Sequence, residues 1–260
     1  MKIEPNSTTE PTPFDDGVLY DIIMGQMADY DLAFYRQLAR EADGPVLDLP
    51  CGTGRVLLPL LQEGIDIEGV DLSAGMLARL RQKAAELDLQ PRVHKARFTD
   101  LRLERQFALI ISPCNSFVHN LTAEDQIESL RRCREHLLPG GLLVIDTFFP
   151  GSQFLATDNQ RVFEGEITHP TTGNRLRMYD SRSFDRVRQL FDSKNEVEEL
   201  DADGRLLSAR SFSTTIRWIY KTEMELLLRI AGFSHWEIYG GFDRRPLELE
   251  TDAMLVFAWK

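Results

Sequence analysis

The 260-residue chain carries 30 Lys and Arg against 41 Asp and Glu, which gives a formal net charge of −11 at pH 7. This acidic balance disfavours broad binding to nucleic acid or to an anionic membrane surface, because both would repel it. The three cysteines are spaced neither as CxxC pairs nor as a disulfide framework, so we expect no metal site and a reducing, cytoplasmic location.

Residues 1–13 are rich in Pro, Ser and Thr and contain few large apolar side chains, which predicts a disordered tail. This start of the chain does not resemble a secretion leader, and no apolar run reaches the length of a membrane span. Between Asp15 and Arg40, aromatic and aliphatic residues recur at helical spacing. One or two amphipathic helices are therefore expected to cap the domain ahead of its first strand.

Strands and helices alternate through the rest of residues 14–150. Strands are predicted at 45–49, 65–72, 92–98, 107–113 and 142–149. Helices are predicted at 55–64, 74–88 and 122–138, the last with Thr122 as its N-cap and a stop at Pro139 to Gly141. This alternation implies right-handed crossovers and a doubly wound, mostly parallel sheet with helices on both faces.

The alternation changes after Pro150. Residues 151–220 show period-two stretches such as "NRLRMYDSRSF" and "GRLLSARSFSTTIRW", with "DADG" as a turn, which predicts an inserted small antiparallel β-sheet. Residues 221–260 return to the core with one helix and two strands, "HWEIYG" and "DAMLVFAWK". The connection between these strands is too short for a crossover, so we expect a C-terminal antiparallel hairpin that completes a seven-stranded, Rossmann-like α/β sheet.

The segment "DLPCGTGR", Asp48 to Arg55, occupies the first strand-to-helix turn. In doubly wound sheets this turn is the usual ligand contact, at the carboxyl ends of the strands. Gly52 and Gly54 allow a ligand to approach the backbone, and the helix N-terminus after Gly54 favours an anionic group. Asp71 ends the second strand, where a carboxylate can accept both hydroxyls of a ribose. Together these residues predict a nucleoside-bearing cofactor.

The acid just before the turn narrows the choice of cofactor. A dinucleotide site requires G-x-G-x-x-G, whereas here Asp48 precedes Pro50, Gly52 and Gly54 and suits a cationic amino group rather than a pyrophosphate. With "GVDLSAGML", "EHLLPGGLLVIDTF" and the closing hairpin, the chain resembles a class I S-adenosylmethionine-dependent methyltransferase of the small-molecule type. The resemblance covers residues 18–150 and extends from "YKTEMELLLRIAGF" to the end.

The resemblance implies a set of cofactor contacts. Asp48 and the Pro50–Gly54 backbone would meet the methionine part of S-adenosylmethionine, Asp71 the ribose, and Leu72 and Met76 the adenine. An N-terminal helix would fold over the cofactor. The full expected set is Tyr20, Tyr30, Asp48, Pro50, Cys51, Gly52, Thr53, Gly54, Arg55, Asp71, Leu72, Met76, Arg97, Phe98, Ser112 and Asn115.

The chain departs from the family pattern at two positions. Pro50 stands where the family usually has its first glycine, so the turn must tolerate a fixed φ and a missing N–H there. Arg97 stands where an acid normally meets the adenine amine. Asp100, or backbone groups of Arg97 and Phe98, would then replace that acid.

The resemblance places residues that line the methyl-transfer region after the fourth strand. "SPCNSFVHNL" places Asn115 and His119 there, either against the cofactor and acceptor or as a turn cap beside a packed histidine. If the acceptor must lose a proton, His119 is the first candidate for the base and Tyr220 the second. Trp218 and Tyr220, where the insert rejoins the core, are candidate walls of the acceptor pocket, and Arg217 beside Trp218 is a candidate partner for a carboxylate on the acceptor. For Arg217 the alternative is a surface arginine at a strand edge.

These observations predict an enzyme that uses S-adenosylmethionine, and releases S-adenosylhomocysteine, to methylate nitrogen or oxygen of a small molecule, with residues 151–220 as a lid. Two alternatives stay open: a nicotinamide-dependent oxidoreductase of the same fold, and a non-catalytic partner subunit that binds S-adenosylmethionine. We expect no nucleic-acid or membrane partner, and a homodimer is one option for its assembly.

Overall fold

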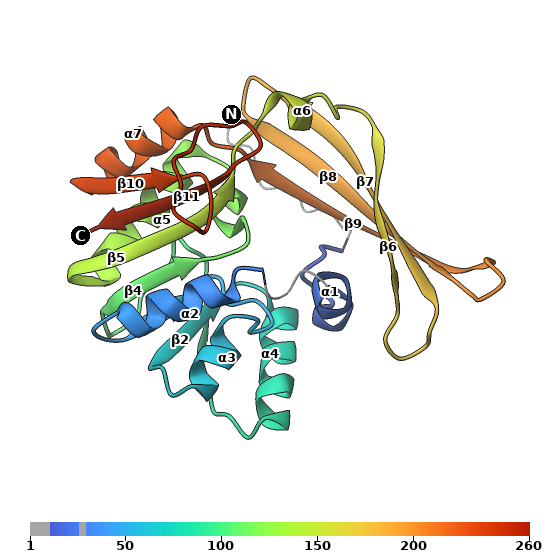
Figure 1. Cartoon of the computed structure of the whole chain (residues 1–260), viewed down its shortest axis with the longest axis horizontal. Coiled ribbons are helices and arrows are strands. Elements are labelled where there is room, and N and C mark those ends of the chain that lie inside the picture. Colours follow the sequence, from blue (N-terminus) through green and yellow to red (C-terminus); the bar gives the residue numbers. More distant parts are fainter. Residues whose placement is uncertain (1–10, 26–29) are drawn as a thin grey trace.

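The computed structural model describes residues 11–25 and 30–260, so most of the expected tail lies outside the described residues. A central sheet has helices on both faces, and a second sheet stands beside it (Figure 1). The elements in chain order are α1 (Gly17–Met24), α2 (Leu32–Glu41), β1 (Val46–Asp48), α3 (Leu57–Gln62), β2 (Ile67–Asp71), α4 (Ala74–Glu86), β3 (Arg92–Lys95), β4 (Phe107–Ser112), the 3-10 helix η2 (Ser116–His119), α5 (Ala123–His136), β5 (Leu137–Phe148), α6 (Ser152–Leu155), β6 (Arg161–Thr168), β7 (Arg175–Asp185), β8 (Leu190–Leu200), β9 (Leu206–Arg217), α7 (Lys221–Ala231), β10 (His235–Tyr239) and β11 (Ala253–Trp259).

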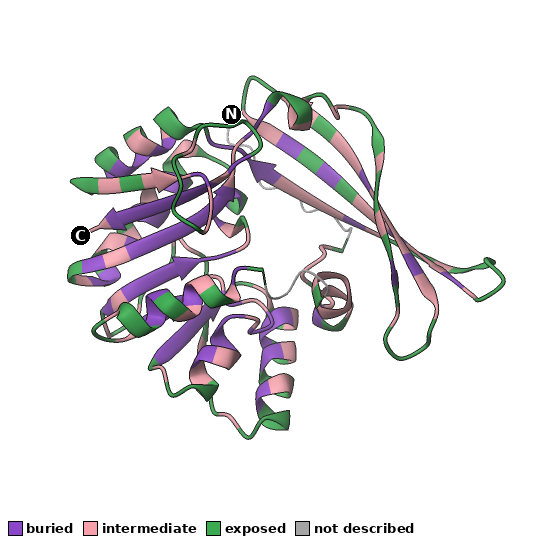
Figure 2. Cartoon of the chain, viewed as in Figure 1, coloured by how far each residue is buried: buried purple, intermediate pink, exposed green. Residues whose placement is uncertain are grey.

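The central sheet has seven strands in the order β10-β11-β5-β4-β1-β2-β3. The strands from β5 to β3 run parallel, whereas β11 runs antiparallel to both β5 and β10. β1, β4 and β11 are mostly buried and apolar because both of their faces are covered (Figure 2). The predicted doubly wound sheet with a C-terminal antiparallel hairpin is therefore confirmed.

Helix α5 begins where the sequence predicts and ends earlier. The Thr122 hydroxyl accepts a hydrogen bond from the Asp125 amide at 3.0 Å, which confirms the predicted N-cap. The sequence predicts a helix to residue 138, but α5 ends at His136. Leu137 already pairs with Phe107 of β4, so its backbone is satisfied by the sheet rather than by the helix.

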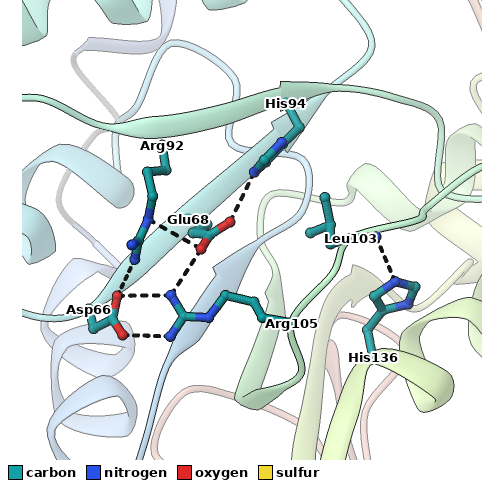
Figure 3. Close-up of polar contacts among 7 residues, drawn as sticks. All are labelled: Asp66, Glu68, Arg92, His94, Leu103, Arg105 and His136. Atoms are coloured by element: carbon teal, nitrogen blue, oxygen red, sulfur yellow. Dashed lines mark hydrogen bonds and ion pairs between the residues drawn. The ribbon is translucent and has the colours of Figure 1, made fainter.

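The connection from β3 to β4, residues 96–106, is fully described and contains no helix. It covers one face of the sheet with the fully buried Leu101. Leu103 donates its amide hydrogen to Nε2 of His136 at 2.9 Å, which fastens the loop to the end of α5 (Figure 3). The loop thus takes the place of a crossover helix.

An ion-pair network holds the neighbouring edge of the sheet (Figure 3). At its centre Glu68 of β2 lies 2.9 Å from His94 Nε2 and accepts a hydrogen bond from Arg105 Nη1 at 2.9 Å. Arg92 and Arg105 also pair with Asp66. These contacts stabilise the edge formed by β2 and β3.

Residues 151–220 contain an antiparallel sheet in the order β6-β7-β8-β9, as the alternating pattern predicts. The chain leaves the core after β5 and returns to it before α7 (Figure 1). Where the insert joins the core, Phe191, Ile216 and Trp218 pack against Val118. The predicted turn between β8 and β9 is closed by a hydrogen bond from Gly204 N to Asp201 O at 3.1 Å.

Helix α1 lies between the core and the inserted sheet (Figure 1). The residues just before α1 approach α4 closely, because a β-carbon on Gly75 of α4 would lie 2.4 Å from the carbonyl oxygen of Asp15. The Ser73 hydroxyl donates a hydrogen bond to the Phe14 carbonyl at 2.6 Å. Three apolar residues of α1 pack on the inserted sheet: Leu19, Ile22 and Ile23. α1 therefore contacts both sheets.

Candidate active site

The carboxyl ends of four neighbouring parallel strands lie at the same end of the central sheet: β2, β1, β4 and β5. Each has a buried polar residue at or near its end: Asp71, Asp48, Ser112 and Asp146. Burying an unpaired polar group costs free energy, so such a row favours a ligand site over plain core. Sequence reasoning identified the first three and missed Asp146, although its place near the end of an apolar strand is the same signal.

The turn after β1 contains two glycines with positive φ, +52° at Gly52 and +84° at Gly54. A β-carbon on Gly54 would lie 2.8 Å from Leu58 and 3.0 Å from Leu80, so this glycine permits close packing of the turn on α3 and α4. A β-carbon on Gly52 would meet no described atom within 4 Å. The backbone at Gly52 is therefore the part of the turn that a ligand can approach.

Asp48 is enclosed at the end of β1, with 2% of its surface exposed. It accepts a hydrogen bond from the backbone of Leu57, the first residue of α3, while its Oδ1 has no partner among the described residues. Burial, opposed by the Arg55 guanidinium, raises the pKa of this carboxyl well above its usual range. A cationic group beside Oδ1 would offset the cost of burying it.

Asp71 is held by the turn that it faces. Its Oδ2 accepts a hydrogen bond from Gly52 N at 2.9 Å, and its Oδ1 accepts one from Ser73 N at 2.7 Å. Burial raises the pKa of Asp71, and these amide hydrogen bonds oppose the rise. The carboxylate is thus fixed beside the open backbone of Gly52, and its oxygens can still accept hydrogen bonds from a diol.

Arg55 joins the turn to the N-terminal cap. Its guanidinium makes a two-point contact with Asp31, with Nη2 donating to Oδ2 at 2.8 Å. Asp31 is fully buried, so this charge-assisted pair is shielded from water. The guanidinium also lies 5.9 Å from the ring centroid of Tyr30. Arg55 and Tyr30, which the sequence places in one site, therefore lie together.

The turn after β4 lies between the ends of β1 and β5. Cys114 and Asn115 both have positive φ, +57° and +56°, which is unusual for consecutive residues other than glycine. Cys114 N donates a hydrogen bond to Asp146 Oδ2 at 3.0 Å, and burial raises the pKa of Asp146 to about 7. Ser112 Oγ is buried and has no partner in the described part of the chain. Backbone strain and unpaired polar groups of this kind concentrate at functional sites.

His119 ends η2, between the core and β9. His119 is exposed, and its ring lies edge to face with Phe14 at 5.2 Å and bonds to the backbone of Thr215. Desolvation by the neighbouring residues lowers the pKa of the imidazole to about 4. His119 is therefore neutral at pH 7 and can accept a hydrogen bond, but it is a weak base.

Tyr20 reaches this region from α1. Burial raises the pKa of its hydroxyl, and the nearby Cys114 and Asp71 add to the rise. Its ring also lies 6.2 Å from that of Phe14. Tyr20 is thus close to the ends of β2 and β4, where the resemblance places the cofactor.

Asp21 fastens α1 to the glycine turn, and sequence reasoning missed it. Its carboxylate accepts hydrogen bonds from Thr53 Oγ1 at 2.6 Å, from Arg79 Nε at 2.7 Å and from Lys83 Nζ at 3.1 Å. Thr53 belongs to the turn, while Arg79 and Lys83 belong to α4. An acid on an amphipathic helix carries no local signal of such a contact, because the contact depends on how the helix docks.

The remaining residues expected against the cofactor differ in how they can reach a ligand. Leu72 is exposed, as is Arg97, whereas Met76 is buried. Phe98 packs edge to face against Phe117 at 6.0 Å. The side chains of Leu72 and Arg97 are therefore open to a ligand, whereas the side chain of Met76 is buried.

The backbone of Cys51 is engaged within the fold, because its N–H donates to the Val70 carbonyl at 2.8 Å and its carbonyl accepts from Gly54 N at 2.9 Å. The Leu49–Pro50 peptide bond is cis. The Cys51 sulfur packs against β2, since a β-carbon on Gly69 would lie 2.7 Å from it. Burial raises the pKa of the Cys51 thiol, which makes it a poor nucleophile.

Arg217 is buried and engaged within the chain. It donates hydrogen bonds to Gln126 Oε1 at 2.7 Å and to Glu223 Oε1 at 2.6 Å. These bonds tie β9 to α5 and α7. A role for Arg217 in holding an acceptor stays a prediction, and any such role would have to share the guanidinium with these partners.

Trp218 and Tyr220 follow Arg217 and differ in exposure. Trp218 is buried in the cluster that joins the insert to the core, and its Nε1 has no partner within the described chain. Tyr220 keeps accessible surface and lies edge to face with Phe149, just after β5, at 6.1 Å. Tyr220 is therefore the more accessible of the two.

The comparisons with known proteins agree with this geometry. The family model of a methyltransferase domain matches residues 46–141, which contain the glycine turn, Asp48 and Asp71. A cypemycin N-terminal methyltransferase from Streptomyces sp. is 26% identical over 252 residues, 95% of this chain and 98% of that protein. The structure of the CcbJ methyltransferase from Streptomyces caelestis has a TM-score of 0.76 at 27% identity, over 95% of this chain and 97% of that chain. Together these matches support a class I S-adenosylmethionine-dependent methyltransferase.

The methyltransferase has a further relative over half of its length. A dTDP-3-amino-3,4,6-trideoxy-alpha-D-glucopyranose N,N-dimethyltransferase from Streptomyces venezuelae is 31% identical over 142 residues, 52% of this chain and 58% of that protein. The predicted enzyme class and its cofactor, S-adenosylmethionine, are confirmed, and the oxidoreductase alternative is not supported. No helix in the described ranges is long and apolar enough to cross a membrane.

Proposed function

We propose that the enzyme transfers a methyl group from S-adenosylmethionine to an amine nitrogen of a small molecule bound between the central and the inserted sheet. The observation that carries the proposal is the buried carboxylate of Asp48, whose unpartnered Oδ1 lies in the same turn region as the open backbone of Gly52. An ammonium or sulfonium cation would complement Asp48, and the ribose diol would complement Asp71. The residues present therefore fit this cofactor.

We assign the N-terminal cap to the cofactor pocket as well. Tyr20 and Tyr30 would cover the bound cofactor, and Arg55 would stand beside its carboxylate end. This assignment is supported by the contact of Arg55 with Tyr30 and by the place of Tyr20 near Asp71. Asn115 and Ser112 would line the pocket from the turn after β4.

Nitrogen is favoured over oxygen by the groups near the acceptor. A neutral amine reacts through its lone pair and needs only correct placement, whereas a hydroxyl also needs a base. His119 is the first candidate for the base, and its pKa of about 4 makes it poorly suited to that task. Among the relatives, one is named an N-terminal methyltransferase and another an N,N-dimethyltransferase.

The protein's own residues would act by placement. When bound, S-adenosylmethionine supplies an electrophilic methyl group on a sulfonium. Neutral His119 would accept a hydrogen bond from the amine N–H and so orient the nitrogen lone pair, while Phe14, Tyr20 and the inserted sheet would exclude water. Tyr220, at the rim, is the second residue that could bind the acceptor. For an amine bound in its neutral form no side chain has to remove a proton before transfer, and the ammonium product can release its proton to water.

We also propose a cytoplasmic enzyme, which the free state of its three cysteines supports. Its acidic charge is the reason to exclude nucleic acid as the acceptor.

Transfer of a labelled methyl group tests this function. The acceptors are glycine, an amino sugar, a peptide with a free N-terminal amine, the N-acetylated form of each, and bulk tRNA. We expect label in the free small amines and none in their acetylated forms. Label entering tRNA or intact protein well above every small amine would contradict the proposal.

A further inference from the structure

The inner face of the inserted sheet is polar at its centre. Strand register places Asp180, Asn195 and Phe212 in one row and Arg182, Ser193 and Thr214 in the next, and opposed residues share one face of a sheet. We call Asp180, Arg182, Ser193, Asn195 and Thr214 the polar band. Apolar residues flank the polar band on both sides. Phe184, Phe191 and Ile216 lie on the side toward the core, and Leu176 and Val197 lie on the side toward α1.

The buried part of the polar band is a connected hydrogen-bond network. Asp180, which is 5% exposed, accepts hydrogen bonds from Ser193 Oγ at 2.6 Å and from Arg182 Nε. Ser193 Oγ in turn accepts one from Asn195 Nδ2 at 2.8 Å. Arg182 also donates to Glu164 at 2.5 Å, so one guanidinium serves two carboxylates and the network keeps a negative charge.

The open part of the polar band is formed by Asn195 and Thr214, which are both partly exposed. Within the described chain, the Asn195 amide oxygen accepts no hydrogen bond and the Thr214 hydroxyl makes none. Thr214 directly precedes Thr215, whose backbone bonds to His119. Thr214 therefore lies on β9, the strand that passes His119, and Asn195 lies on the neighbouring strand β8.

The polar band is not explained by stability. Buried ion pairs and polar networks contribute little more than well-packed apolar residues would, and apolar residues flank this one on the same face. A network that fixes the rotamer of Asn195 through Ser193 and Asp180 does have a use in recognition, because it presents the amide in one orientation.

We propose that Asn195 and Thr214 bind hydroxyl groups of the acceptor, so that the substrate is a hydroxylated amine of the amino-sugar type and these two residues determine specificity. The inference rests on the proposed function, since it places the acceptor against this face. An amide and a hydroxyl both donate and accept, which matches the ring hydroxyls of a sugar. The negative charge of the network also disfavours an acidic acceptor.

Binding to the complex of the enzyme with S-adenosylhomocysteine tests the proposal by calorimetry. The two probes are 3-amino-3-deoxyglucose and cyclohexylamine, which share a six-membered ring and an amine but differ in hydroxyl groups. We expect the amino sugar to bind more tightly to the wild type. Asn195→Ala and the near-isosteric Thr214→Val should each weaken amino-sugar binding roughly 3- to 10-fold and leave cyclohexylamine and S-adenosylhomocysteine unchanged.

The matched control is Lys194→Ala, because Lys194 adjoins Asn195 but lies on the opposite, exposed face of the same strand. Equal amino-sugar affinity in Asn195→Ala, Thr214→Val and Lys194→Ala would overturn the inference, as would a wild type without preference over cyclohexylamine. In both cases methyl transfer to other small amines would leave the proposed function standing. If no small amine accepts a methyl group from wild-type enzyme that binds the cofactor, the proposed function itself fails.

Discussion

Asp71 is the site residue whose surroundings are defined most narrowly, because backbone amides of Gly52 and Ser73 fix both of its oxygens. We predict that Asp71→Ala weakens S-adenosylhomocysteine binding by about 1.5–3 kcal/mol, the range for a hydrogen bond to a charged group. Glu86→Ala, which changes an exposed acid of α4, is the control. Calorimetric titration gives both affinities, and an Asp71→Ala affinity equal to that of the control would remove Asp71 from the cofactor site.

A substitution at His119 distinguishes placement of the acceptor from base catalysis. Because the pKa of His119 is lowered to about 4, it does not titrate between pH 6 and 8. His119→Gln should therefore lower kcat for an amine by less than about tenfold and leave the shape of the pH profile unchanged over this range, since a general base is worth roughly 10²–10⁴. A loss of a hundredfold or more together with an altered profile would show that His119 acts as a base.

Asp146 makes the stability of the unliganded protein depend on pH. Burial raises its pKa from 3.8 to about 7, so the folded state retains a proton that the unfolded state releases between these values. Stability contributed by the protonated form is therefore present below about pH 4 and is lost as the pH rises toward 7. Asp146→Asn cannot ionise, so we predict that its free energy of unfolding, relative to wild type, increases by about 1–4 kcal/mol between pH 5 and pH 8. Urea denaturation at the two pH values measures this, and an equal difference at both would contradict the shift.

At the scale of elements, the central domain could be predicted because its signals are local. The Thr122 cap, the apolar run of β1 and the glycine turn each depend on a few consecutive residues. The end of α5 depends instead on pairing between Leu137 and Phe107, which are far apart in sequence. Helical periodicity continues past His136, so the sequence alone favours a longer helix.

The candidate site residues also divide into those with a local sequence signal and those that depend on tertiary contacts. Asp48 and Asp71 were predicted because each ends a strand beside the glycine turn. Asp21 acts through the docking of α1, and Asp180 lies beside Asn195 only because of the register between β7 and β8. Such contacts arise from tertiary structure, and neither helical nor strand periodicity encodes them.

At the scale of the whole molecule, charge is distributed unevenly. Residues 151–220 carry 10 Lys and Arg against 11 Asp and Glu, so nearly all of the acidic excess lies on the methyltransferase core. The insert therefore has little long-range attraction for a charged macromolecule. If the insert holds the acceptor as proposed, it would do so by short-range hydrogen bonds and apolar contacts on its inner face.

Helix α1 connects the two halves of this molecule. Asp21 holds it to Thr53 in the glycine turn and to α4, while its apolar residues pack on the inserted sheet. The helix also carries Tyr20 toward the ends of β2 and β4. A ligand that orders α1 from one side should therefore favour binding on the other side.

We predict that S-adenosylhomocysteine tightens binding of an amine acceptor about 5- to 50-fold, and that the acceptor tightens S-adenosylhomocysteine by the same factor, because coupling between two sites is reciprocal. In Asp21→Ala the factor should fall toward one, since α1 loses its bonds to the turn while its apolar contacts with the inserted sheet remain. Each ligand is titrated calorimetrically with and without the other, in wild type, in Asp21→Ala and in the Glu86→Ala control. Equal coupling in Asp21→Ala and wild type would show that the two sites communicate through another part of the fold, and no coupling in wild type would show that α1 does not link them.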